Sequence, residues 1–155
     1  MKTPGAPDMN IILKTGILPK GDLNSIADVK GVTVGHETLD HGNARTGVTA
    51  ILPHQGNIFR EKVMAASHVI NGFGKSTGLI QIDELGTIET PIILTNTLSV
   101  GDAYKGLVQY MIEQNVEIGR TAGTVNPVVC ECNDGFLDDI RGWYIRPGHK
   151  WSAIE

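Results

Sequence analysis

The sequence predicts a mixed α/β domain of the α+β type, and its length, glycines and apolar spacing carry this prediction. At 155 residues the chain has the length of one ordinary domain. Its 19 glycines fall between short apolar runs, as expected for turns between strands. One long segment has the three- and four-residue apolar spacing of a helix. Several buried strands and an amphipathic helix are therefore expected.

Short apolar or β-branched runs predict the strands. In RTGVTAILPH, Val48, Ala50 and Leu52 share one face, and Pro53 ends the run because it cannot donate a ladder hydrogen bond. The other expected strands are residues 29–34, which should end in a turn, and residues 62–72, 91–98 and 127–132. The last of these should be closed by the Asn-Asp-Gly turn that follows it.

Residues 99–115 predict the helix. Ser99 and Asp102 have the spacing of a capping box at its start, and Asn115 is suited to its end. Apolar or amphipathic side chains recur over three turns, at Val100, Ala103, Tyr104, Leu107, Val108, Met111 and Ile112.

Composition and charge narrow the possible functions. Thirteen basic residues against 17 acidic ones give a formal net charge of −4, which argues against binding a phosphate backbone. The sequence has no apolar run of about 18 residues that would predict a membrane span. Its N-terminus lacks the apolar core of a secretory signal. A cytoplasmic protein is expected, with no nucleic acid and no membrane among its partners.

The chain is expected to hold one domain over residues 10–155, after a flexible tail at residues 1–9. No repeat, low-complexity tract or Pro/Ser-rich linker divides it. The C-terminal RPGHKWSAIE predicts a turn and the beginning of a helix without a complete apolar face or C-cap. The sequence is therefore expected to be the N-terminal portion of a domain that is truncated at its C-terminus.

Cys130 and Cys132 are one residue apart on an expected strand, so their side chains should point to the same face. C-x-C without a second pair is a weak metal signal, and it is not the C-x-x-C of redox sites. Two reduced, buried and inert cysteines are expected. Glu131 should face the other way, either at a solvated surface or in a pocket with a cationic partner. The residues alone leave both alternatives open.

Two further patterns carry less weight. Gly74-Lys75-Ser76 matches the end of a phosphate-binding loop, but residue 69 is Val69 where the first glycine should stand. The following TGLIQIDELG lacks a strong helix pattern, whereas such a loop needs a helix N-terminus. A glycine-rich loop beside a pocket or a sheet edge is expected instead. The five histidines lack metal-ligand spacing, so no metal site is predicted.

Several stretches occur in an order that is typical of one family: LNSIADVKGVTVGHETL, RTGVTAILPH, NGFGKSTGLIQIDELGTIETPIILTNTLSVGDAY and VVCECNDGFLDDIRG. Together they resemble the self-processing DmpA family, which includes the L-aminopeptidase/D-esterases and the β-peptidyl aminopeptidases. The resemblance covers nearly the whole chain from about residue 16. It implies a four-layer αββα sandwich of the DmpA/ornithine acetyltransferase type, present here only in part.

The resemblance also implies an activity. It implies a serine aminopeptidase or amidase that releases N-terminal residues from small peptides, amides or esters through an acyl-enzyme. The precursor cuts itself before the nucleophilic serine, which lies downstream of this chain, so no catalytic residue is expected within it. No metal or organic cofactor is implied. The implied partners are the substrate, the C-terminal β chain of the same precursor and further copies in a homo-oligomer.

Carried over residue by residue, the resemblance places substrate-binding residues in ECNDG. Glu131 matches the family's acidic residue and should receive the substrate's ammonium group. Asn133 stands where characterised members have a tyrosine, and its amide is suited to bind an oxyanion or a substrate carbonyl. Asp134 matches the family and either shapes the turn or reaches the site. Residues 72–78 and 94–97 are expected to be further pocket-side or core-strand segments.

A rival hypothesis is a catalytically inactive, truncated homologue that acts as an oligomeric or interaction module. It predicts that the 155-residue product is soluble, folded and inactive. A fragment of a sandwich should instead expose apolar strand faces and aggregate, because half a core cannot offset chain entropy.

Overall fold

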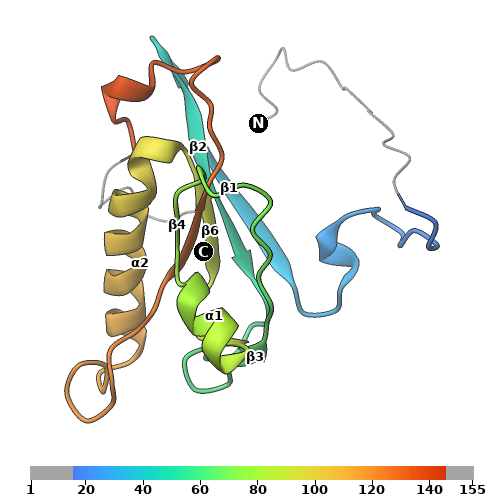
Figure 1. Cartoon of the computed structure of the whole chain (residues 1–155), viewed down its shortest axis with the longest axis vertical. Coiled ribbons are helices and arrows are strands. Elements are labelled where there is room, and N and C mark those ends of the chain that lie inside the picture. The colour runs from blue at the N-terminus through green and yellow to red at the C-terminus, as the bar shows by residue number, and fades with distance from the viewer. Residues whose placement is uncertain (1–15, 146–155) are drawn as a thin grey trace.

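A five-stranded sheet is the centre of the molecule, whose computed structural model describes residues 16–145. All neighbouring strands are antiparallel except β6 and β7, which are parallel. Figure 1 shows the sheet beside the long helix α2 (Val100–Gln114). The strands lie in the order β1 (Thr33–His41), β2 (Ala44–Leu52), β6 (Ile92–Thr95), β7 (Val128–Glu131) and β4 (Ser76–Thr77).

Shorter elements complete the described chain. The strands β3 (Val63–Met64) and β5 (Thr87–Ile88) form a separate antiparallel pair, and α1 (Leu79–Leu85) connects β4 to β5. Three 3-10 helices, η1 (Ile26–Asp28), η2 (Thr97–Ser99) and η3 (Ile140–Gly142), stand before β1, before α2 and after β7. The mixed α/β class predicted from the sequence is thus confirmed.

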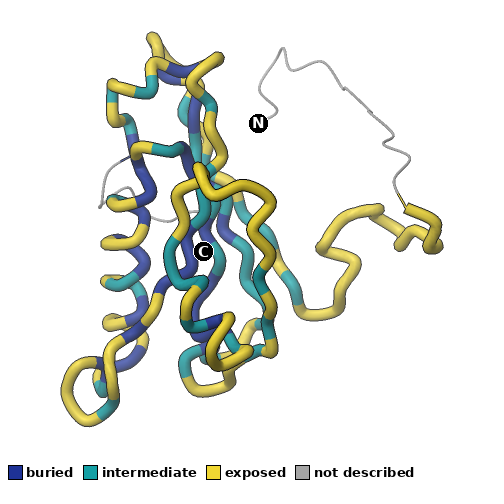
Figure 2. The backbone as a smooth tube through the Cα atoms, in the orientation of Figure 1, coloured by how far each residue is buried: buried dark blue, intermediate teal, exposed yellow. Residues whose placement is uncertain are grey.

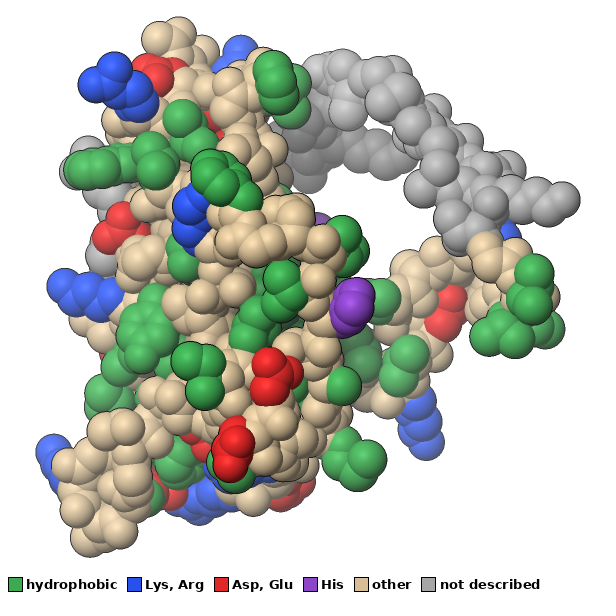
Figure 3. Space-filling model, viewed as in Figure 1, with side chains coloured by type: hydrophobic (Ala, Val, Ile, Leu, Met, Phe, Trp, Pro, Cys, Tyr) green, Lys and Arg blue, Asp and Glu red, His purple; other side chains and the backbone are tan. Residues whose placement is uncertain are grey.

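Some expectations concern residues that the structure does not describe. The tail expected at residues 1–9 and the turn and helix expected at residues 146–155 lie outside the described residues. Among residues 16–145, no helix combines the length and apolarity that crossing a membrane requires. On the face seen in Figure 3, Lys and Arg side chains lie apart from one another and form no continuous patch.

The first hairpin confirms one predicted strand and corrects another. In β2 the buried side chains alternate along the strand and include Val48 and Ala50, as predicted. The strand expected at residues 29–34 is wrong, because β1 begins only at Thr33 and runs on through Gly35 to His41. Gly31 adopts a φ of +94° in a turn before it. The polar second half of β1 remains a strand because it pairs along the whole of β2 at the sheet edge.

The remaining strand predictions have mixed outcomes. Strands are confirmed at β6 and β7, although β6 ends at Thr95 and the chain then enters η2. The buried strand expected at residues 62–72 is wrong, because only the short β3 forms, neither of its residues is buried, and Ile70 is 92% exposed. An apolar run forms a strand only where a neighbouring strand accepts its hydrogen bonds. After Met64 no strand of the described chain pairs with this segment.

Helix α2 matches its predicted bounds and packs against the sheet. Val100, Ala103, Leu107 and Met111 are buried, and in Figure 2 the buried stretches of the helix face the sheet. The predicted capping box is wrong, because the Ser99 side chain makes no cap hydrogen bond. Instead, the Asn96 side chain accepts from the Ser99 backbone N–H at 3.0 Å, because the 3-10 turn η2 comes before the helix.

The buried core lies between α2 and the middle of the sheet. Ala50, Ile93 and Val129 are opposite one another on β2, β6 and β7, and each is 0% exposed. Leu107 and Met111 belong to the same core cluster. This packing fixes the relative positions of the strands whose carboxyl ends form the candidate site.

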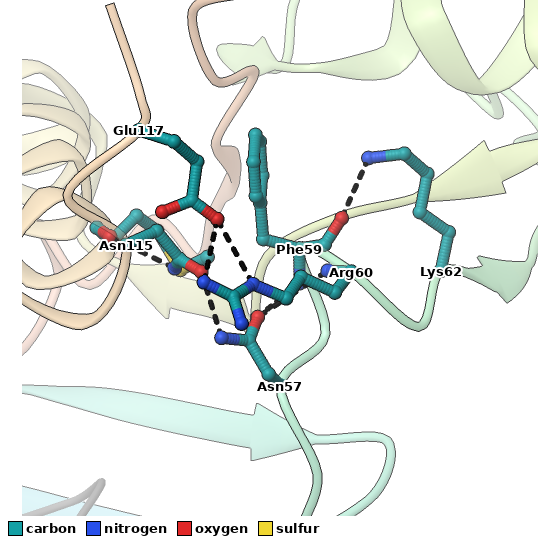
Figure 4. A network of polar contacts seen from close by, with 7 residues as sticks. Asn57, Phe59, Arg60, Lys62, Asn115 and Glu117 are labelled. Carbon is teal, nitrogen blue, oxygen red and sulfur yellow. Dashed lines mark hydrogen bonds and ion pairs between the residues drawn. The ribbon is translucent and has the colours of Figure 1, made fainter. Parts of the chain in front are cut away.

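A polar network holds the C-terminal end of α2. Asn57 Nδ2 donates to Asn115 Oδ1 at 2.7 Å, and Asn115 Nδ2 donates to the backbone of Met111 at 3.0 Å. Close by, Arg60 pairs with Glu117. Figure 4 shows these side chains pointing toward one another. The buried amide of Asn115 therefore both ends α2, as predicted, and joins it to the loop after β2.

Glu89 gives the described chain a pH-dependent contact. Its side chain is buried and pairs with Lys62 at 2.5 Å, and it also accepts the Asn126 backbone N–H at 3.0 Å. Burial alone would raise the pKa of this carboxyl, but the hydrogen bonds from Lys62 and Asn126 outweigh it and hold the pKa below its ordinary value.

Replacing Glu89 with glutamine is expected to make the stability of the protein less dependent on pH. A carboxyl with a lowered folded-state pKa stabilises above its unfolded-state pKa, and this contribution is lost as pH falls through the folded-state value. Glu89→Gln should therefore be less stable than the parent protein at neutral pH, and the difference should shrink in acid. Denaturation at a series of pH values measures it. A constant difference would contradict the assigned charge on Glu89.

Candidate functional site

The carboxyl ends of β6 and β7 identify the candidate site. These strands form the parallel pair of the sheet, and Thr95 is opposite Glu131 at their last residues. In sheets with parallel strands, ligands bind beyond the carboxyl ends. The segments that leave this end are residues 96–99, which lead into α2, and residues 132–139, which lead into η3. Figure 1 shows η3 close to the start of α2.

Unpartnered polar atoms gather at the same end of the sheet. Buried polar side-chain atoms normally have hydrogen-bond partners, so each exception calls for an explanation. In the part of the chain that the structure describes, the buried side-chain atoms without a partner all lie at or just after the ends of β6 and β7. They are Thr97 Oγ1, Ser99 Oγ, Glu131 Oε2, Asp134 Oδ1 and Asp138 Oδ2. This end of the sheet is therefore rich in oxygens that can still bind donors.

Glu131 lies between the sheet and the glycine-rich loop. Its backbone N–H donates to the carbonyl of Lys75 at 3.0 Å, and a carbon added at Gly74 would lie 3.7 Å from its Oε1. The side chain is half-buried, and Oε2 is buried without a partner. The carboxylate is therefore partly withdrawn from solvent by the loop. Among residues 16–145 no cation forms an ion pair with Glu131.

Lys75, the nearest cation in the sequence, is engaged elsewhere. Its Nζ donates to the carbonyl of Phe73 at 2.8 Å and lies 3.7 Å from the centre of the Phe73 ring. Because Lys75 bends back over its own loop, it leaves the Glu131 carboxylate uncompensated.

Asn133 is exposed, and its amide has a fixed orientation. Its Oδ1 accepts the backbone N–H of Gly135 at 3.0 Å, which is the hydrogen bond of an Asx turn. The expected Asn-Asp-Gly turn is present in this form. Since Oδ1 is used inside the turn, Nδ2 is the end of the side chain that can donate to a ligand.

Asp134 shapes the turn and also borders a pocket. Its backbone carbonyl accepts the N–H groups of Leu137 and Asp138 at 2.7 and 2.9 Å. Asp138 is buried, and its Oδ1 accepts the backbone N–H of Arg45 at 2.8 Å, which ties the turn to the start of β2. Asp134 thus stabilises the turn. It also lines an open pocket over the sheet, where a ligand can reach it.

That pocket brings together only some of the residues expected at the site. Asp134 and residues 94–96 border it, together with Cys132, which was expected to be inert. Neither Glu131, which lies against the glycine-rich loop, nor Asn133 is part of its lining. The segment 94–97 thus shows both expected features, because residues 94–96 border this pocket and the first two residues belong to β6. The sequence placed Thr97 only in the expected segment 94–97, gave Ser99 only a capping role, and did not indicate Asp138. The order strand, helix, strand over residues 92–131 could have indicated them. That order predicts a parallel pair of strands, and these residues follow the ends of the two strands.

The cysteine prediction is partly wrong. Both cysteines are free, but Cys132 is exposed and Cys130 is half-buried. Burial and the neighbouring Cys132 raise the pKa of the Cys130 thiol. Cys132 is accessible because β7 ends at Glu131, one residue before it. No group of three or more His, Cys, Asp or Glu side chains within residues 16–145 is arranged to hold a metal ion.

The glycine-rich loop lies at a sheet edge, as expected. Ser76 and Thr77 form β4, which pairs with β7. The expectation that no helix follows is wrong, because α1 begins directly after Gly78. This helix has seven residues and a single buried side chain, Ile82, too little to produce a periodic apolar pattern. Since Lys75 and Ser76 belong to the loop and strand, the phosphate-loop interpretation finds no support.

Known proteins resemble this chain over most of its length. The model of peptidase family S58 matches residues 24–155. A beta-peptidyl aminopeptidase BapA from Sphingosinicella microcystinivorans is 35% identical over 144 residues, and one from Sphingosinicella xenopeptidilytica has the same identity. Each match covers 87% of this chain and 35% of the relative. The chain thus spans about a third of the length of these curated relatives.

Solved structures have the same fold. The PH0078 protein from Pyrococcus horikoshii OT3 superposes with a TM-score of 0.87 at 56% identity, covering 91% of this chain and 42% of that one. A beta-aminopeptidase from Burkholderia sp. superposes with a TM-score of 0.80 at 39% identity, and the match covers 90% of this chain and 40% of that one.

A third solved structure of similar fold is a serine aminopeptidase. It is an L-aminopeptidase D-Ala-esterase/amidase from Ochrobactrum anthropi, with a TM-score of 0.77 at 33% identity, covering 90% of this chain and 41% of that one. That enzyme is described as a prototype of the serine aminopeptidases and a variant of the Ntn hydrolase fold. The likeness confirms the predicted fold class, of which this chain supplies a part. With the family model and both curated relatives in agreement, the chain belongs to peptidase family S58, the DmpA family.

Proposed function

We propose that this chain forms one wall of the substrate pocket of a serine aminopeptidase, with Glu131 as the acceptor for the substrate's N-terminal ammonium group. The observation that carries the proposal is the buried, unpartnered Oε2 of Glu131 at the carboxyl ends of β6 and β7. A carboxylate in this state is stabilised by a charge-assisted hydrogen bond from a cation. A free α- or β-amino group supplies that cation.

The proposed reaction releases the N-terminal residue of a small peptide, amide or ester. A serine downstream of residue 155, exposed by self-cleavage as the N-terminus of a β chain, attacks the carbonyl of that residue. The serine's own α-amine accepts the hydroxyl proton, because such amines titrate near neutrality, at about 7.7–8.0. The amine or alcohol leaves with a proton, and water then hydrolyses the acyl-enzyme. The scheme uses no metal or organic cofactor.

Residues of this chain orient the substrate in that scheme. Asn133 Nδ2, freed by the Asx turn, donates to the carbonyl or to the oxyanion that develops from it. Asp134 supports the turn that carries Asn133. The complete enzyme is proposed to be cytoplasmic, to consist of this chain's domain with its β chain, and to assemble as a homo-oligomer.

Replacing Glu131 with glutamine in the full-length protein is expected to raise KM for free-amine substrates about 10-fold or more, because hydrogen bonds to charged groups are worth about 1.5–3 kcal/mol. Steady-state kinetics on an aminoacyl amide measures the change. Glu113→Gln, on the exposed face of α2, is the matched control and should leave KM unchanged. If Glu131→Gln also left KM unchanged, Glu131 would not bind the substrate's amine.

A further inference from the structure

The loop of residues 71–75 is held in one conformation beside Glu131. Asn71 Oδ1 accepts the backbone N–H of Phe73 at 3.1 Å, and Lys75 Nζ donates to the Phe73 carbonyl at 2.8 Å. At its end, the carbonyl of Lys75 accepts the Glu131 backbone N–H at 3.0 Å. The loop is thus closed on itself and attached to β7 at the residue proposed to bind the amine.

Phe73 is the large side chain that this loop presents. The residue is 81% exposed, although the Lys75 ammonium lies 3.7 Å from the centre of its ring. An ammonium over an aromatic ring is attracted to its face and restricts its motion. The next residue, Gly74, brings the backbone against the Glu131 carboxylate, where an added carbon would lie 3.7 Å from Oε1. The loop that carries this aromatic ring therefore also contacts Glu131, through Gly74 and the Lys75 carbonyl.

A substrate held at Glu131 by its amine has the first atom of its side chain two or three bonds from the amine nitrogen. We infer that Phe73 is the specificity-determining residue for this side chain and selects N-terminal residues with large apolar groups. The inference rests on the proposed function of Glu131. Burial of apolar surface against the ring favours such residues, and contact with one such group changes specificity by about 10- to 200-fold.

The test uses the full-length protein and two amides that share a leaving group, backbone and stereochemistry, one with an isobutyl and one with a methyl side chain on the N-terminal residue. The parent protein should prefer the isobutyl substrate in kcat/KM. Phe73→Ala should reduce this preference about 10-fold, and Phe73→Leu should retain most of it. Ile80→Ala is the matched control, because it truncates a residue of α1 that is 87% exposed. It should leave kcat/KM unchanged for both substrates.

The outcomes separate the two proposals. A parent protein that prefers the methyl substrate, or a preference that survives Phe73→Ala, overturns the role of Phe73 and leaves Glu131 untouched. An unchanged KM for both substrates in Glu131→Gln overturns the proposed function itself, and the inference with it. A larger KM in Glu131→Gln, together with a preference for the isobutyl substrate that is lost only in Phe73→Ala, supports the proposed roles of both Glu131 and Phe73.

Discussion

Truncating Leu107 to alanine is expected to lower the free energy of unfolding by about 3 kcal/mol, because a buried leucine loses its transfer energy and leaves a cavity. Leu107 is 1% exposed and belongs to the core cluster with Ile93 and Val129. These partners lie on β6 and β7, so the cavity would open directly above the parallel pair. Chemical denaturation of the purified protein measures the loss.

Ile112→Ala is the control for this prediction. Ile112 lies on the same helix but is 47% exposed, so its truncation should cost well under about 1 kcal/mol. Equal losses in both variants would contradict the packing of α2 against the sheet. The contrast also matters for the site, because α2 fixes the strands whose ends carry Glu131.

Local patterns were enough to predict the elements that bury one face. The spacing of Leu107 and Met111 predicts α2, and the alternation of Val48 and Ala50 predicts β2, since each periodicity belongs to a single secondary structure. The N-cap of α2 was not predictable in this way. Ser99 has the right spacing, but the chain enters the helix through η2, where Asn96 takes the capping role.

The candidate site depended on contacts between distant residues. The residues alone left Glu131 between a surface and a pocket and gave Asn133 and Asp134 only a turn, and family likeness supplied their expected roles. The contact between Lys75 and Glu131, and that between Arg45 and Asp138, join residues far apart in the chain. No periodicity encodes such pairings, because they follow from which strands become neighbours. The environment of Glu131 could therefore be seen only in the folded chain.

Replacing Gly78 with alanine is expected to cost about 3 kcal/mol of unfolding free energy, because a conformational and a steric penalty add. Gly78 has a φ of +79°, a left-handed conformation that costs other residues roughly 1–2 kcal/mol. An added carbon would also lie 2.6 Å from the Pro127 carbonyl oxygen. That oxygen belongs to the backbone and cannot rotate away, so the junction of β4 and α1 must move from β7.

Gly86→Ala separates the two penalties. Gly86 has a φ of +66°, but nothing lies within 4 Å of an added carbon, so only the conformational cost of roughly 1–2 kcal/mol should remain. Denaturation of both variants tests this. Equal losses of unfolding free energy would show that the close approach to the Pro127 carbonyl adds no steric penalty. Because β4 follows the glycine-rich loop, Gly78→Ala should also displace Gly74 from Glu131. In the full-length protein it should therefore raise KM, whereas Gly86→Ala should not.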